Sequence, residues 1–421
     1  MKFTYSWLKE HLKTEHQFNE VVDKLTAIGL EVESVQDTGL AYKDFIVGQV
    51  LEEEKHPNAD KLKLCKVDIG REKVDVVCGA PNVTKGMKVV YAPVGCVIPV
   101  NQMKIKAAKI RGVESYGMMC SEYELGISNE HDGIISLEQD KEVGSSFADS
   151  SGMNDILIEI GITPNRQDCL GVLGVARDLA AAGVGKLKNR EFKTEKGSFE
   201  SPIKIEIQDN DMCPAFAGSY IKNVKNVASP DWLQKKLKSI GLRPISALVD
   251  ITNYVMFDQN RPLHVYDADQ VKGKIIVRSA QDGESFKALD EKTYDLKKGM
   301  CTISDEEKVL GLGGIMGGES TGCNFDTINV LLESALFDNV NTARTGRDLS
   351  ILSDARYRFE RGIDPSSTLE GIHYATQLIL EICGGECSEI VLAGKISETP
   401  NTIDISGKNI VKRLGLEITD D

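Results

Sequence analysis

The sequence predicts a multidomain α+β protein with a small β-barrel near its N-terminus. The chain has 421 residues, and at roughly 100–200 residues per domain this length indicates two to four domains. Short strand patterns separated by Gly, Pro and Asn turns follow one another from Phe45 to Ile110, which is typical of a small barrel. After Ile203, helices and strands alternate without a regular β-α-β rhythm, which favours α+β over a doubly wound sheet.

Composition and charge limit the classes of function. A formal net charge of −14 argues against a general nucleic-acid coat, because phosphate binding requires Lys and Arg to displace counterions. Any RNA contact is therefore expected to be local. No run approaches the roughly 18 uncharged apolar residues of a membrane span, and the start of the chain lacks the apolar stretch of a signal peptide. We expect a cytoplasmic protein with no membrane contact.

The ten cysteines are scattered along the chain, and reduced, mostly buried thiols fit an intracellular protein. Cys383 and Cys387 have a spacing that begins some zinc sites, but no second Cys pair or His pair follows them. We therefore predict no metal site in the chain.

Residues 1–39 are predicted to form a helix followed by a strand. The helix ends at Gly29, where a left-handed residue is wanted, and residues 30–35 nearly alternate as a half-buried strand does. Four apolar side chains fall on one face of the helix, namely Val21, Val22, Leu25 and Ile28. This segment is too short to fold alone.

Residues 40–151 are assigned to the barrel. Its predicted strands are Phe45–Leu51, Leu62–Ile69, Lys73–Cys78, Lys88–Tyr91 and Ile105–Ile110. Four cations, Lys104, Lys106, Lys109 and Arg111, lie in a window without an acidic residue. Strand alternation would send Lys104 and Lys106 to one face, so that the four form a basic strip that contacts an RNA backbone. The alternative is a solvated edge strand that uses Lys to discourage aggregation.

Residues 152–190 resume a strand pattern, followed by a helix that ends at Gly183. Arg190–Pro202 is charged and rich in turn residues, as a linker is. The last large domain is assigned to residues 200–399, and residues 400–421 begin a further unit that stops short. The predicted elements of the domain at residues 200–399 are a helix between Ser229 and Gly241, strands at Lys274–Ser279, Cys301–Ser304, Val309–Leu312 and Val330–Leu332, and a helix over Ser366–Cys383.

Three pieces of the last domain carry candidate chemistry. Arg243–Asp267 mixes an apolar frame with Thr252, Asn253 and His264, as the wall of a polar pocket does. Leu310–Glu319 holds five glycines in ten residues, which lets backbone amides approach a ligand closely. Its spacing fits neither a dinucleotide-binding fingerprint nor a P-loop.

The third piece contains Glu333, which interrupts the apolar run from Val330 to Ala335. A buried carboxylate without a partner is costly, so something must hydrogen-bond to it. One alternative is a structural salt bridge to Arg344, Arg347 or Arg356. The other is the hydroxyl group of a ligand. Spacing alone favours the salt bridge.

Six motifs along the chain resemble those of a known family, the beta subunit of bacterial phenylalanyl-tRNA synthetase. His56–Leu62, Val77–Val83 and Lys109–Ser121 resemble, in this order, its tRNA-binding OB domain. Thr163–Cys169, Arg243–Asp267 and Ser353–Pro365 resemble later parts of the same subunit, whose editing domain covers the last two motifs. The resemblance implies that residues 1–39 and 152–190 form one discontinuous α+β domain, with the OB-fold barrel inserted between them and the α+β editing domain following.

The resemblance also implies roles for individual residues. In the family, the editing pocket hydrolyses tyrosine wrongly esterified to tRNA(Phe), and a Glu recognises the extra phenolic hydroxyl. That Glu corresponds to Glu333 and the pocket His to His264. The remaining pocket residues correspond to Thr252, Asn253, Gly317, Gly318 and Ala355, and Ser353 stands where family members often have Thr. His264 is expected to orient water or the ribose; the alternative is a core His that holds the turn at Asp267.

The resemblance places the ATP-using synthetic site in a separate alpha subunit, within an expected alpha2-beta2 enzyme that requires ATP and Mg. No cofactor is expected in this chain. The expected partners are therefore the alpha subunit and tRNA(Phe). Two alternatives remain open: a non-catalytic tRNA-binding scaffold, and a hydrolase that acts on free amino-acid esters.

Overall fold

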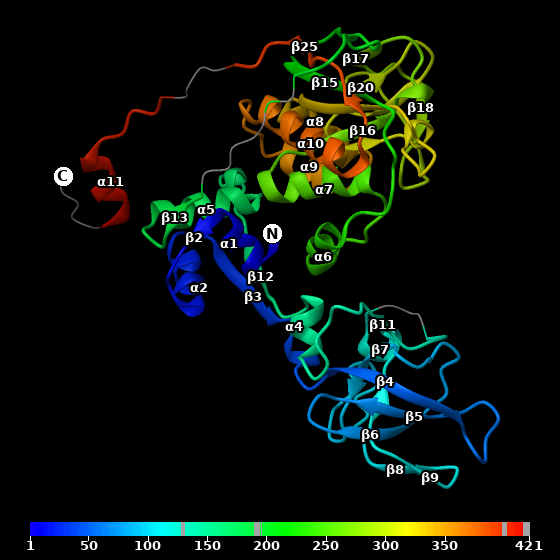
Figure 1. Ribbon diagram of the computed structural model, residues 1–421. Helices are drawn as coiled ribbons and strands as arrows, with labels where there is room; N and C mark the ends of the chain where they lie inside the picture. Colours follow the sequence, from blue (N-terminus) through cyan, green and yellow to red (C-terminus); the bar gives the residue numbers. More distant parts are fainter. Residues whose placement is uncertain (128–130, 189–193, 195, 398–401, 416–421) are drawn as a thin grey trace. The chain divides into compact units, whose positions relative to one another are not determined.

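The computed structural model describes residues 1–127, 131–188, 194, 196–397 and 402–415. Within these residues the fold is mixed α+β, as predicted. The chain divides into two compact units. Figure 1 labels their helices and strands. The first comprises Met1–Thr163, Val172–Asn189 and Asp231–Pro244, and the second comprises Pro164–Gly171, Arg190–Pro230 and Ile245–Asp421.

In the first unit, chain segments on both sides of the barrel share one antiparallel sheet. Strand β12 (Ile156–Gly161) lies between β1 (Lys2–Thr4) and β3 (Glu31–Asp37). Helices α1 (Tyr5–His11), α2 (Phe18–Ala27) and α5 (Val172–Ala181) supply buried side chains to this core, including Trp7, Leu25 and Leu179. Gly29 has φ +88°, so α2 ends with the left-handed residue that the sequence predicts.

Helix α6 (Asp231–Ser239) belongs to the first unit, although the sequence pattern led us to group it with the following domain. Its Lys236 pairs with Glu10 of α1 at 2.5 Å and lies over the ring of Trp7. The cap and stop residues locate a helix along the chain, but they carry no information about which core the helix joins.

The barrel region of the first unit is a six-stranded antiparallel sheet in the order β10-β7-β4-β5-β6, with β11 paired to β7. Its strands are β4 (Ile46–Lys55), β5 (Lys63–Asp68), β6 (Lys73–Cys78), β7 (Lys88–Ala92), β10 (Met118–Met119) and β11 (Ser136–Leu137). A separate hairpin pairs β8 (Ala108–Ile110) with β9 (Val113–Ser115). Short helices α3 (Glu122–Leu125) and α4 (Phe147–Ser151) follow.

The strand predicted at Ile105–Ile110 is wrong in its first half. Ile105 exchanges backbone hydrogen bonds with the loop at Gly95 and Cys96, and Gln102 has φ +58°, so this stretch folds back as a narrow loop. Lys104 makes only an isolated bridge to Val97. The strand alternation that we used to place Lys104 and Lys106 on one face therefore does not apply.

The second unit contains two five-stranded sheets. The first has the order β14-β17-β20-β21-β22, and the second has the order β16-β23-β15-β24 with β25 also paired to β15. The strands of the first sheet are β14 (Ile205–Ile207), β17 (Ile275–Ser279), β20 (Cys301–Ser304), β21 (Val309–Leu312) and β22 (Met316–Gly317). Those of the second sheet are β15 (Ala215–Lys222), β16 (His264–Asp267), β23 (Val330–Leu336), β24 (Glu386–Cys387) and β25 (Val391–Gly394).

Side chains from both sheets of the second unit form one core, which includes Phe216, Val277, Ile303, Leu310 and Leu331. Helix α10 (Ser367–Cys383) contacts β15 and β23, and it also packs beside α7 (Ala247–Gln259) (Figure 1). Helices α8 (Asn339–Asp348) and α9 (Asp354–Phe359) follow β23. Strand β23 is longer than the predicted strand Val330–Leu332 and continues through Glu333 to Leu336.

Candidate functional site

Glu333 lies in the middle of β23 with an exposed fraction of 6%. Side chains alternate along a strand, so Glu333 shares its face with Leu331 and Ala335, which both belong to the core between the two sheets. Ser334 faces the other way and donates a hydrogen bond to the carbonyl of Thr368 in α10. The strand therefore carries a carboxylate into an interior that is otherwise apolar.

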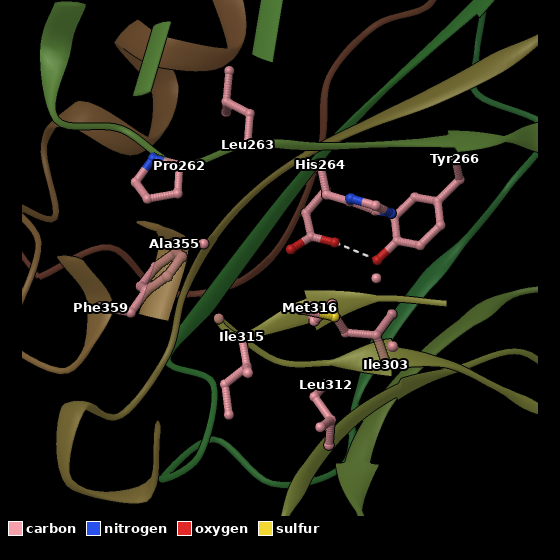
Figure 2. A pocket seen from close by; sticks show the side chains of 14 residues that line it. Pro262, Leu263, His264, Tyr266, Ile303, Leu312, Ile315, Met316, Ala355 and Phe359 are labelled. Atoms are coloured by element: carbon pink, nitrogen blue, oxygen red, sulfur yellow. Dashed lines mark hydrogen bonds between the residues drawn. The ribbon is translucent and has the colours of Figure 1, made fainter. Parts of the chain in front are cut away.

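The partner of this carboxylate is a tyrosine. The hydroxyl of Tyr266 on β16 donates a hydrogen bond to Oε2 of Glu333 (Figure 2). Burial raises the pKa of Glu333 from its ordinary 4.5 to about 7, although the Tyr266 hydrogen bond and the charge of Arg261 act in the opposite direction. Burial and the neighbouring Glu333 raise the pKa of Tyr266 well above its ordinary value, so the hydroxyl keeps its proton.

None of the three arginines considered as salt-bridge partners bonds to Glu333 among the described residues. Arg356 pairs with Glu360 at 3.0 Å and donates to the carbonyl of Ile351. A fourth arginine, the fully buried Arg261, donates to the carbonyls of Ala335 and Ser367 and to the hydroxyl of Thr368. The salt-bridge alternative is therefore wrong, and in its place the structure has a neutral hydroxyl donor.

His264 lies directly opposite Glu333, because the two are register partners in the β16–β23 pair. Its ring meets that of Tyr266 edge to face, with centroids 4.4 Å apart. The buried Nε2 atom has no hydrogen-bond partner among the described residues. Burial lowers the pKa of His264 to about 4, so the ring is neutral at physiological pH. In a neutral imidazole one ring nitrogen donates a hydrogen bond and the other accepts one, so Nε2 can bond to a water molecule in either tautomer.

Our structural alternative, in which His264 holds the turn at Asp267, is wrong. The Asp267 carboxylate accepts from the amide of Asp269 and from the hydroxyl of Thr327, at 3.2 and 2.8 Å. The turn is therefore stabilised without the imidazole.

The glycine-rich stretch forms a hairpin of β21 and β22, in which Gly317 and Gly318 have different tasks. A Cβ atom on Gly317 would lie 2.3 Å from Cε1 of His264, so only glycine lets the hairpin approach the imidazole. The amide of Gly318 donates to the carbonyl of Leu310 at 2.6 Å. That amide is committed to the hairpin and is not available to a ligand.

These elements surround a cavity of about 70 Å³ (Figure 2). It is smaller than the roughly 150 Å³ cavity that holds a benzene molecule, so a complete phenol ring requires the walls to move. The lining residues are Pro262, Leu263, His264, Tyr266, Ile303, Gly311, Leu312, Gly314, Ile315, Met316, Gly317, Glu333, Ala355 and Phe359. The structure therefore brings together four of the eight candidate residues: His264, Gly317, Glu333 and Ala355.

The other four candidates lie outside the cavity lining. Thr252 and Asn253 are on α7, where the Thr252 hydroxyl donates to the carbonyl of Val249 in the same helix. Gly318 belongs to the hairpin backbone. Ser353 caps α9 by accepting from the amide of Arg356, and its hydroxyl donates to the carbonyl of Ile315 at 2.7 Å. Ser353 thus ties the start of α9 to the glycine hairpin, and Ala355 lines the cavity from the first turn of the helix.

Our sequence reasoning missed Tyr266 and Phe359. Tyr266 follows His264 by two positions on one strand, so strand alternation places both rings on the same face. That signal was present in the sequence. Phe359 lies at the end of α9, one helical turn after Ala355, and its position at the cavity depends on how α9 packs.

The four candidate cations of the barrel are all exposed. None of them makes an ion pair within the described residues, so their charges are free to act on solvent or on a ligand. Lys109 lies on β8, and Arg111 occupies the β8–β9 turn with φ +49°. The buried His56 holds this hairpin, because its Nε2 atom lies 3.1 Å from the carbonyl of Ile110 and its Nδ1 atom accepts from the amide of Asn58.

Two family models match the chain. The model of the B3/4 domain matches residues 212–384, and that of the putative tRNA binding domain matches residues 45–146. The phenylalanine–tRNA ligase beta subunit of Bradyrhizobium diazoefficiens is 50% identical over 420 residues, which cover 99% of this chain and 52% of that protein. The corresponding subunit of Brucella melitensis is 52% identical over 423 residues, with coverages of 100% and 52%. The chain belongs to this family.

Family membership confirms the resemblance read from the motifs. All eight candidate pocket residues lie within the B3/4 match, and the four candidate cations lie within the tRNA-binding match. The chain spans about half the length of the curated beta subunits it matches. In the part of the chain that the structure describes, no helix is both long and apolar enough to span a lipid bilayer.

Proposed function

We propose that this chain is the tRNA-binding and editing portion of a phenylalanine–tRNA ligase beta subunit, and that it hydrolyses tyrosyl-tRNA(Phe). One observation carries the proposal: Glu333 is buried beside a cavity, and among the described residues its carboxylate hydrogen-bonds to a tyrosine hydroxyl and forms no ion pair. A site with these groups suits a ligand that brings a hydroxyl into an apolar pocket.

The chemical logic follows from what a synthetic site can discriminate. A pocket that accepts phenylalanine cannot strongly reject an analogue that merely adds a hydroxyl, so a second site can use that hydroxyl as a positive signal. An ionised carboxylate forms hydrogen bonds roughly twice as strong as neutral ones. Glu333 is therefore the specificity residue, and Ala355 and Phe359 provide apolar contacts for the ring.

Hydrolysis requires a positioned water and stabilisation of the oxyanion, with no protein nucleophile. The neutral His264 is suited to orienting that water or the ribose, because its Nε2 atom has no hydrogen-bond partner within the described chain. Asn253 and the remaining amides of the glycine hairpin are our candidates for the oxyanion, whereas the Gly318 amide is already bonded. Thr252 and Asn253 must approach the cavity with the tRNA end for this assignment to hold.

The barrel is assigned to tRNA(Phe) binding through Lys104, Lys106, Lys109 and Arg111. We further propose a cytoplasmic alpha2-beta2 enzyme, because the relatives are named as beta subunits of a ligase. ATP and Mg would serve phenylalanine activation in the alpha subunit, and no step of the proposed hydrolysis in this chain uses them.

The test is deacylation of tyrosyl-tRNA(Phe) by the purified chain, beside phenylalanyl-tRNA(Phe) as the second substrate. Glu333→Ala should abolish the preference for the tyrosyl ester. Glu370→Ala, which removes an exposed carboxylate from α10, is the matched control and should retain it. Equal hydrolysis of both esters by the wild type and by Glu333→Ala would contradict the proposed specificity. Hydrolysis of neither ester by the wild type would contradict the editing activity and favour a scaffold that only binds tRNA.

A further inference from the structure

Tyr266 is the donor that Glu333 has within the described residues, and it comes from the neighbouring strand. His264 pairs with Glu333 and Tyr266 pairs with Leu331 in the β16–β23 register. The side chains of His264, Tyr266 and Glu333 therefore project from the same face of the sheet. Tyr266 is diagonal to Glu333, within reach of a long side chain, and its hydroxyl bonds to one carboxylate oxygen.

The two oxygens of Glu333 differ in their surroundings. Oε2 accepts the Tyr266 hydrogen bond, whereas Oε1 has no hydrogen-bond partner in the described part of the chain. Glu333 also lines the cavity. One oxygen is thus held by the protein and the other remains available to a ligand.

The other titratable groups around Glu333 do not compete for Oε1. The fully buried Arg261 donates its hydrogen bonds to the carbonyls of Ala335 and Ser367 and to the hydroxyl of Thr368. Burial raises the pKa of the Cys213 and Cys301 thiols, so both remain neutral, and His264 is neutral as well. Tyr266 is therefore the group that orients the carboxylate.

We propose that Tyr266 is a positioning residue for substrate discrimination: its hydroxyl fixes one oxygen of Glu333 so that the other accepts the phenolic hydroxyl of a tyrosyl ligand. This inference rests on the proposed function, because it needs a ligand that carries a hydroxyl. It gives the pocket a two-tyrosine arrangement, in which the carboxylate bridges a hydroxyl of the protein and one of the substrate.

The physical reason is the cost of an unrestrained buried carboxylate. Without the Tyr266 hydroxyl, Glu333 can rotate, and its charged form loses a charge-assisted hydrogen bond. A ligand hydroxyl would then have to order the carboxylate as well as bind to it. The expected result is weaker selection for tyrosine, by about tenfold.

The variant for the test is Tyr266→Phe, which removes the hydroxyl and keeps the ring that packs against His264. Tyr374→Phe is the matched control, because Tyr374 is another buried tyrosine of the same unit and does not line the cavity. Two readouts are measured on the full chain: binding of L-tyrosinamide against L-phenylalaninamide, and the kcat and KM for deacylation of the two aminoacyl-tRNA(Phe) substrates.

We expect Tyr266→Phe to lower the preference for tyrosinamide about tenfold, to raise KM for the tyrosyl ester more than it lowers kcat, and to leave phenylalaninamide binding unchanged. The pH at which tyrosine selectivity appears should move upward, since the lost hydrogen bond favoured the charged carboxylate. A merely structural role would weaken both ligands alike and leave this pH unchanged.

An unchanged or stronger preference for tyrosine in Tyr266→Phe would overturn the inference, because it would mean that Tyr266 is passive or competes with the ligand. Failure of the proposed function looks different. A wild-type chain that prefers tyrosinamide but deacylates neither ester contradicts hydrolysis and leaves the binding role of Tyr266 standing. A wild-type chain without any preference for tyrosinamide contradicts both.

Discussion

We propose that the cavity of the second unit and the four exposed cations of the barrel both act on tRNA, but the two sets of side chains are held in opposite ways. Glu333, His264 and Tyr266 project from paired strands into a core, and each is held by its neighbours. Lys104, Lys106, Lys109 and Arg111 are exposed and have no ion-pair partners in the described chain. Specific recognition is therefore expected at the cavity, and only general attraction of phosphate at the four cations of the barrel.

The largest expected effect comes from filling the cavity. Ala355→Leu adds apolar volume at the first turn of α9, in the wall of the cavity that Glu333 also lines, and leaves the polar groups unchanged. Deacylation of both tyrosyl-tRNA(Phe) and phenylalanyl-tRNA(Phe) should fall by about 100-fold or more, since the ring can no longer enter. Binding of tRNA(Phe), measured by filter retention, should stay at the wild-type level. Retained deacylation would separate the activity from this cavity.

Gly317→Ala tests how closely the hairpin must approach the imidazole. Its new Cβ atom would lie 2.3 Å from Cε1 of His264, so the hairpin or the ring must move. We expect a loss of about 1–3 kcal/mol in the free energy of unfolding of the second unit, as for overpacked cores. Gly322→Ala is the control, because its Cβ atom would meet nothing closer than 3.2 Å. Urea denaturation of both variants gives the comparison.

The pH dependence follows from the raised pKa of Glu333, about 7. Below this pH the carboxyl is protonated and accepts a weaker hydrogen bond, and above it the carboxylate accepts a charge-assisted one. The ratio of tyrosyl to phenylalanyl deacylation should therefore rise several-fold between pH 6 and pH 8. Taking the ratio cancels the effect of hydroxide on ester hydrolysis. Glu333→Gln should give a ratio that does not vary with pH.

The same shift has the opposite sign for stability. A folded pKa above the unfolded value of 4.5 means that the folded state holds an extra proton between pH 4.5 and 7, so this group destabilises the fold as the pH rises through that window. Relative to Glu333→Gln, the wild type should lose stability between pH 5 and pH 8. Urea denaturation at both pH values checks this.

The smallest effects are expected at the barrel. Replacing Lys109 or Arg111 by Ala should weaken tRNA(Phe) binding a few-fold and lower the salt dependence of binding by about one phosphate contact each. Tyrosine selectivity should not change. A loss of selectivity would contradict the division between general attraction at the barrel and specific recognition at the cavity.

The sequence predicts much of this fold because local patterns determine much of it. Strands β20 and β21 begin and end where their patterns do, and Gly29 ends α2 as predicted. The grouping of α6 with the first unit depends on Lys236 meeting Glu10 and Trp7, which are more than 200 positions away in the chain. No pattern within α6 encodes those contacts.

The candidate site shows the same difference between features set by local sequence and features set by contacts between distant residues. Family resemblance identified Glu333 and His264, and strand pairing brings them face to face. The hydrogen bond of Tyr266 depends on the register between β16 and β23, and the position of Ala355 depends on how α9 packs. Thr252 and Asn253 lie outside the cavity lining, and the Thr252 hydroxyl donates to the backbone of its own helix, α7. Their assigned role stays a prediction.

The most direct measurement is a crystal structure of this chain with a non-hydrolysable analogue of tyrosyl-adenosine. We predict that the walls open around the ring, and that the phenolic hydroxyl lies within hydrogen-bond distance of Oε1 of Glu333 while Tyr266 still bonds to Oε2. An analogue bound elsewhere, or one that displaces Tyr266 from Glu333, would contradict it.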